Sequence, residues 1–74
     1  MLTFSEKMAI LMTLNEKLNR LRERRQYYIF KRNTIGLSSV QEDIFADLEE
    51  EIRLLESAAK TIDEMEVKKW YKQY

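Results

Sequence analysis

Carboxylates are the side chains of this sequence whose spacing first suggests chemistry, because the chain contains neither His nor Cys. Without these two residue types there can be no disulfide, thiolate nucleophile, zinc-finger site or histidine proton relay. Two acidic pairs remain, Asp47 with Glu50 and Asp63 with Glu66, and paired carboxylates are typical ligands of Mg²⁺. Both pairs fall on one expected helix, about four turns apart, so they cannot converge on one ion. We therefore expect a solvated acidic face, with no enzymatic activity, no metal site, no cofactor and no small-molecule substrate.

A basic and aromatic stretch over residues 20–32 offers a different kind of chemistry. Its cations are Arg20, Arg22, Arg24, Arg25, Lys31 and Arg32, and three aromatic residues lie among them. Guanidinium groups interleaved with aromatic rings suit phosphate contacts and base stacking. The whole chain, however, carries 13 basic and 13 acidic residues, so no overall field attracts a nucleic acid. A small dimeric nucleic-acid-binding regulator is therefore the alternative to our main hypothesis, which is protein binding.

Apolar side chains that lie off the expected core are the candidate contacts for a protein partner. They are Met12, Tyr27 and Phe30 in the first half of the chain and Trp70, Tyr71 and Tyr74 in the second. Trp and Tyr are enriched among the residues that dominate binding energies. Trp70 has two further interpretations, packing near Phe4 at the open end of the fold or anchoring at a membrane surface. We favour packing for Trp70 and partner binding for the two tyrosines.

The elements that position these side chains are two long helices. The chain has no Pro and a single glycine, Gly36, which marks the expected boundary between them. We predict helices over about residues 4–34 and 39–71, joined by a loop over residues 35–38 within one domain, 1–74. Thr3 and Glu6 form a capping box for the first helix. The second helix has two candidate boxes, Ser38 with Gln41 or Ser39 with Glu42.

Apolar residues at intervals of three and four give each helix one hydrophobic face. On the first helix this stripe is Phe4, Met8, Leu11, Leu14, Leu18, Leu21, Tyr28, Ile29 and Ile35. On the second it is Val40, Ile44, Leu48, Ile52, Leu55, Ala59, Ile62 and Met65, extended to Trp70. A loop this short forces the two helices to run antiparallel. The predicted fold class is therefore all-α, an antiparallel two-helix hairpin.

Opposite charges in the two halves favour this antiparallel pairing. Residues 1–37 carry eight basic and three acidic side chains, whereas residues 38–74 carry five basic and ten acidic ones. Exposed ion pairs between the halves would select orientation more than they stabilise. Arg25 and Glu51 both fall within the apolar stripes and come close together in this register. We expect them to form a partly buried structural ion pair; the alternative is that Arg25 receives an acidic ligand.

A lone hairpin leaves part of its apolar surface uncovered, and a chain of this size rarely gains more than about 3–5 kcal/mol of net stability from its own core. We expect a second copy to cover that surface and complete a four-helix bundle. A larger protein that supplies the missing helices is the alternative. A swapped dimer, in which the Gly36 loop opens and the helices continue, also fits the sequence.

The function that follows is that of a non-enzymatic interaction module. Such a module would act as an adaptor, a small chaperone, or an inhibitor or regulator of a larger protein, of the kind that phages, viruses and plasmids encode. The sequence shows neither a secretory signal nor an apolar run of about 20 residues that could span a membrane. We therefore expect a cytoplasmic protein.

Overall fold

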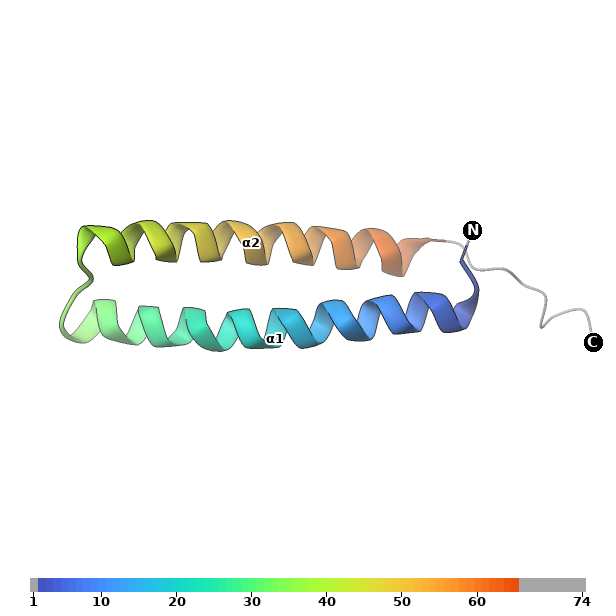
Figure 1. Ribbon diagram of the computed structural model, residues 1–74, viewed down its shortest axis with the longest axis horizontal. Helices are drawn as coiled ribbons and strands as arrows, with labels where there is room; N and C mark the ends of the chain where they lie inside the picture. Colours follow the sequence, from blue (N-terminus) through green and yellow to red (C-terminus); the bar gives the residue numbers. More distant parts are fainter. Residues whose placement is uncertain (1, 66–74) are drawn as a thin grey trace, which may run out of the picture.

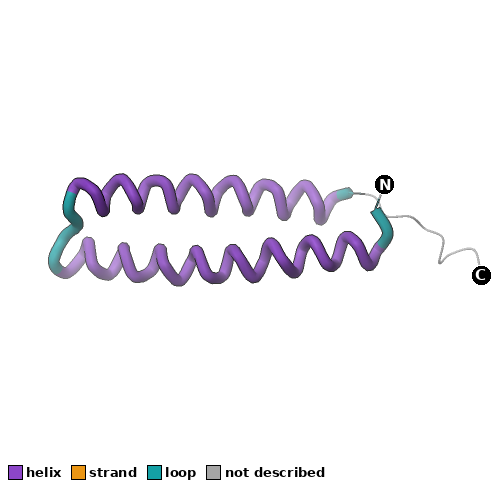
Figure 2. The backbone as a smooth tube through the Cα atoms, in the orientation of Figure 1, coloured by secondary structure: helices purple, strands orange, loops and turns teal. Residues whose placement is uncertain are grey.

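Two antiparallel helices make up the computed structural model, which describes residues 2–65 (Figure 1). α1 spans Phe4–Thr34 and α2 spans Ser39–Glu64. The two helices pack side by side along their length and are joined by a short loop at one end (Figure 2). The predicted all-α antiparallel hairpin is therefore confirmed.

Both helices begin at a capping box. The Thr3 hydroxyl accepts a hydrogen bond from the Glu6 N–H at 3.1 Å, and the Thr3 N–H donates to the Glu6 carboxylate at 2.9 Å. At α2 the Ser38 hydroxyl accepts from the Gln41 N–H at 3.2 Å, and the Ser38 N–H donates to the Gln41 side chain at 3.0 Å. Of the two boxes that the sequence allowed for α2, the structure forms the one that starts at Ser38.

Gly36 closes α1 in the left-handed backbone conformation, with φ at 85°. The N–H groups of Ile35 and Gly36 both donate to the carbonyl of Lys31, at 2.9 Å each, and so satisfy the end of the helix. Glycine adopts this conformation without the steric cost that a Cβ atom imposes. The single glycine of the chain therefore stands where the backbone requires one.

The core lies midway along the hairpin, where Leu18 and Leu21 of α1 meet Leu48 and Ile52 of α2. Tyr28, Leu55 and Ala59 pack around these buried residues. Along α1 the inward positions continue through Leu11 and Leu14 and include Lys7 and Arg25. This regular alternation of three and four residues is that of a coiled coil.

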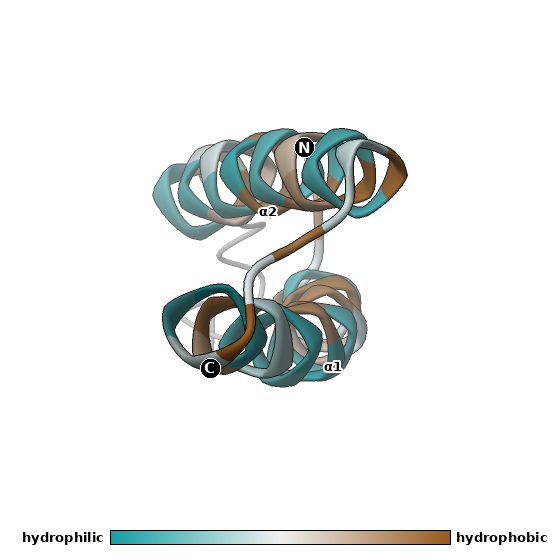
Figure 3. Cartoon of the chain, turned by 90° about the vertical axis from the view of Figure 1, so that its left-hand side faces the viewer, coloured by the Kyte–Doolittle hydropathy of each residue, from teal (hydrophilic) through white to brown (hydrophobic). Residues whose placement is uncertain are grey.

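The predicted stripe of α2 is wrong at its first two residues and at Met65, which is 39% exposed. Val40 is 65% exposed and Ile44 is 39% exposed, whereas Phe45 is only 8% exposed and belongs to the buried set. Stepping back from Ile52 by four and then three residues leads to Leu48 and Phe45, so Ile44 falls on the flank of the helix. At the ends of α1, Phe4, Met8 and Ile35 are exposed as well. In the end-on view, hydrophobic residues therefore also lie on the outside of the pair (Figure 3).

The open end of the hairpin is closed by Lys7 of α1. Its ammonium group donates hydrogen bonds to the carbonyl of Asp63 and, at 3.3 Å, to the carbonyl of Met65. α2 has no basic residue in its last turn, and Asp63 and Glu64 place negative charge where the helix dipole disfavours it. α2 ends at Glu64, and Met65 is extended; the predicted continuation of this helix to residue 71 lies outside the described residues. The predicted packing of Trp70 near Phe4 lies outside the described residues.

Candidate interaction surface

The core residues of α1 and α2 meet along one line, which we call the seam. The surface of the hairpin to either side of this seam differs. Lys17 precedes the buried Leu18 and Glu51 precedes the buried Ile52, so both lie on one flank, which we call the Lys17 side. Arg22 follows the buried Leu21, and the residues that follow Leu48 and Leu55 lie on the opposite flank, which we call the Arg22 side. The two sides carry different chemistry.

Ion pairs cross the seam on both sides. On the Lys17 side, Lys17 Nζ lies 3.4 Å from a carboxylate oxygen of Glu51. On the Arg22 side, Arg22 lies 2.7 Å from Glu56, and Arg25 lies 3.9 Å from Glu49. These exposed pairs are worth about 0–1 kcal/mol each. They set the alignment of basic α1 against acidic α2, as the opposite charges of the two halves predicted.

The predicted ion pair between Arg25 and Glu51 is wrong. Arg25 occupies an inward position and its side chain is 26% exposed, but it turns to Glu49 on the Arg22 side. Glu51 pairs with Lys17 on the other side, and its side chain is 48% exposed. A register drawn from sequence numbers gives the level of a residue along the hairpin, but not the side of the seam on which its side chain emerges.

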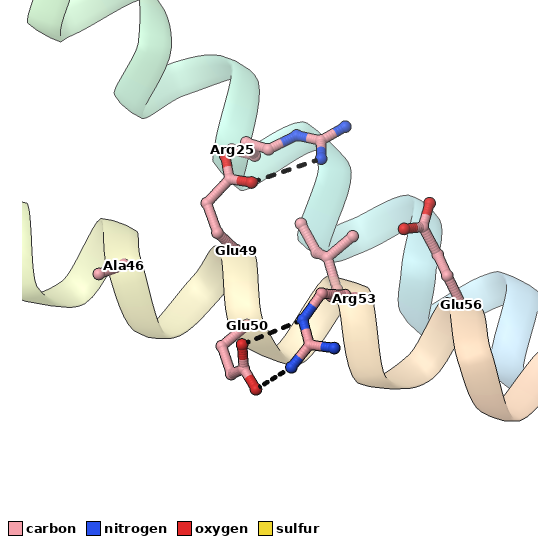
Figure 4. Close-up of a pocket in the computed structure, with 7 residues that line it drawn as sticks. Arg25, Ala46, Glu49, Glu50, Arg53 and Glu56 are labelled. Atoms are coloured by element: carbon pink, nitrogen blue, oxygen red, sulfur yellow. Dashed lines mark hydrogen bonds and ion pairs between the residues drawn. The ribbon is translucent and has the colours of Figure 1, made fainter.

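A shallow hollow of about 460 Å³ lies on the Arg22 side (Figure 4). Arg25 and Arg53 project into it beside Glu49, Glu50 and Glu56. Arg53 donates a hydrogen bond to Glu50 at 3.2 Å, and this contact raises the pKa of Arg53 above its usual value. Each arginine that lines the hollow already has a carboxylate partner. The hollow is therefore a network of satisfied surface charges and not a site prepared for an anion.

The acidic pairs do not converge within the part of the chain that the structure describes. Asp47, Glu50 and Asp63 all lie on α2, and residues 2–65 contain no group of three acidic side chains that could hold a metal ion. Glu66 lies outside the described residues. Within residues 2–65, no third acidic side chain joins Asp47 and Glu50.

The six cations of the basic stretch fall into two groups. Arg22 and Arg25 form ion pairs, and the guanidinium of Arg32 lies over the ring of Phe45, 4.8 Å from its centre. The remaining three have no ion-pair partner among residues 2–65: Arg20, Arg24 and Lys31. Half of the predicted nucleic-acid surface is thus engaged within the hairpin.

The predicted partner-binding residues of α1 are exposed. Met12, Tyr27 and Phe30 all project from the hairpin, although Tyr27 also packs edge-on against the ring of Tyr28, with centroids 5.5 Å apart. Trp70, Tyr71 and Tyr74 lie outside the described residues. The structure adds three apolar residues that the sequence analysis had placed in the core or passed over, namely Ile10, Val40 and Ile44; Leu54, expected off the stripe, is exposed as well. The exposure of Val40 and Ile44 could have been found by counting back in threes and fours from Ile52 and Leu48.

Apolar residues are distributed unevenly between the two sides of α2. On the Arg22 side the residues next to the core are all acidic: Glu42, Glu49, Glu56 and Asp63. The equivalent residues on the Lys17 side are Ile44, Glu51, Ala58 and Met65. A second, apolar hollow on this same side is lined by Ala9, Ile10, Thr13 and Leu14 of α1. The Lys17 side is therefore the apolar side of the hairpin.

Comparison of the chain with protein-family models, with curated protein sequences and with solved structures gave no match in any of the three. Neither described helix has a window long and apolar enough to cross a lipid bilayer.

Proposed function

We propose that this chain is a non-enzymatic interaction module, which binds another protein chain through the apolar side chains that its two-helix fold leaves exposed. Its first partner is a second copy of itself, in a four-helix bundle. The module then serves a larger protein as an adaptor, a small chaperone, or an inhibitor or regulator.

One observation carries the proposal. Among the described residues, five apolar side chains are buried, whereas eleven large ones are exposed. A protein that acts alone hides most of such side chains, and contiguous exposed apolar surface marks an interaction site. A two-helix layer can bury only one stripe of each helix, so the others require helices from elsewhere.

The chemistry of the chain supports a binding role over a catalytic one. Histidine and cysteine are absent from the sequence, and the carboxylates of the described hairpin are all exposed. Binding through apolar side chains needs none of these groups.

The test is the mass of the purified chain in solution, measured by light scattering over a concentration series. We expect a dimer, or a stable complex with a copurifying protein. Replacing both Ile44 and Leu54 by Glu should abolish the complex while circular dichroism still reports helix. A wild-type chain that stays monomeric at every concentration and copurifies with no other protein contradicts the proposal.

The second candidate is a nucleic-acid-binding regulator. The observation in its favour is that Arg20, Arg24 and Lys31 have no ion-pair partner in the described hairpin, with Tyr27 and Phe30 exposed nearby on α1. A gel-shift assay at increasing salt tests it, because phosphate contacts give a steep loss of affinity with salt.

A further inference from the structure

We propose that the second copy docks on the Lys17 side, about a two-fold axis that runs along the length of the hairpin. In this arrangement α1 of each copy packs against α2 of the other, and both loops lie at the same end of the bundle. The inference rests on the proposed function, because it names the partner and the side of the hairpin through which an interaction module works.

The apolar content of the Lys17 side supports this choice. Ile10, Ile44 and Leu54 are exposed there, and Ala58 leaves room on the seam for a close approach. Two helices side by side, each about 10–12 Å across and about 40 Å long, present roughly 800 Å². That area equals the roughly 800 Å² that each partner contributes to a standard stable interface. The Arg22 side, by contrast, would bury the acidic column of α2, whose charges are costly to desolvate.

Charges on the Lys17 side select the direction of the axis. Arg20 lies three residues after Lys17, and Asp47 lies four residues before Glu51, so both lie at one level, one turn from the Lys17–Glu51 pair. Both side chains are exposed, and neither has an ion-pair partner among residues 2–65. A lengthwise axis keeps every residue at its own level while it exchanges the helices. Arg20 then faces the partner subunit's Asp47, and Asp47 faces the partner subunit's Arg20.

A two-fold axis that crosses the hairpin gives the opposite result. It would lay α1 on α1 of the partner and reverse their directions about the middle of the helix, near residue 19. The cluster of Lys17, Arg20 and Arg24 would then meet its own copy, and Glu51 would meet the partner subunit's Glu51. Like charges placed together across an interface are repulsive and exclude that pairing. The lengthwise axis replaces these repulsions by attractions between opposite charges.

Cross-linking between single-cysteine variants tests the arrangement. The natural chain has no cysteine, so Arg20→Cys and Asp47→Cys each introduce one defined thiol, and a mixture of the two cross-links only between copies. With a bis-maleimide linker of about 8 Å, the mixture should give a hetero-linked dimer, identified by a size tag on one chain. Arg20→Cys alone should give none, because the lengthwise axis puts the two copies of α1 at the diagonal of the bundle.

Any one of three outcomes overturns the inference. Efficient linking of Arg20→Cys to itself would show the crossed axis, and a chain that light scattering finds monomeric would show that a second copy does not dock. The matched variants Leu54→Glu and Met12→Glu test the side. Leu54→Glu should raise the dissociation constant of the dimer at least tenfold more than Met12→Glu does. Equal effects contradict the choice of the Lys17 side. The proposed function survives any of these results if another protein copurifies with the wild-type chain and is lost from the Ile44 and Leu54 double variant.

Discussion

The replacement of Ile52 by Ala should cost far more stability than the same replacement of Ile44, and this difference tests the observed core. Ile52 is 1% exposed and packs among Leu18, Leu21 and Leu48, whereas Ile44 is 39% exposed on the Lys17 side. Truncating a buried Ile to Ala costs about 2–5 kcal/mol. A core only two helices thick relaxes easily, so we expect about 3 kcal/mol for Ile52→Ala and under about 1 kcal/mol for Ile44→Ala.

The size of this effect makes it easy to measure. A loss of about 3 kcal/mol lowers the ratio of folded to unfolded chain more than a hundredfold. It also removes most of the free energy of unfolding expected for a chain of this length. Urea titration followed by circular dichroism measures it, at a concentration low enough for the chain to be monomeric. Both variants gain Ala on the same helix, so helix propensity cancels between them. Equal losses of unfolding free energy would refute the observed core. They would indicate that Ile44 is buried as well, as the predicted stripe through Val40 and Ile44 requires.

Three further predictions follow from single positions. Gly36→Ala should destabilise the hairpin by about 1 kcal/mol in the same urea assay, because alanine is strained at a φ of 85°; no change would show that the loop adopts another conformation in solution. Glu51→Ala should lower the free energy of unfolding by less than about 1 kcal/mol, since the pair of Glu51 with Lys17 is exposed. A loss of about 3 kcal/mol would show instead that Glu51 is buried. For the nucleic-acid alternative, Arg24→Glu should abolish a salt-sensitive gel shift, and binding that survives this change removes Arg24 from the contact surface.

The helices and their boundary could be predicted because local chemistry determines them. Gly36, the capping boxes at Thr3 and Ser38, and the three-and-four spacing each act within a few residues of the chain. The end of α2 at Glu64 involves a contact that is not local. The ammonium group of Lys7, far away in sequence, donates hydrogen bonds to the carbonyl groups of Asp63 and Met65 there.

The ion pairs and the exposed surface could be predicted only in part, because they depend on rotation as well as register. Ile44 and Phe45 are adjacent and both apolar, and nothing in their types decides which one turns inward. The decision comes from Leu48 and Ile52, which face α1 and fix the rotation of the helix. The same rotation places Glu51 beside Lys17 and Glu49 beside Arg25, so these residues form the observed ion pairs.

The acidic column of α2 explains why a partner would use one side of the hairpin and avoid the other. Glu49 and Glu56 are matched by Arg25 and Arg22 across the seam, while Glu42 and Asp63 have no ion-pair partner among residues 2–65. A second copy that approached this side would have to desolvate the ion pairs and the two unpaired carboxylates together, which costs more than their mutual attraction returns. On the Lys17 side the equivalent column is mainly apolar, so burial there is favourable. One column of side chains thus aligns α2 on α1 and, in the proposed dimer, directs the second copy to the opposite side.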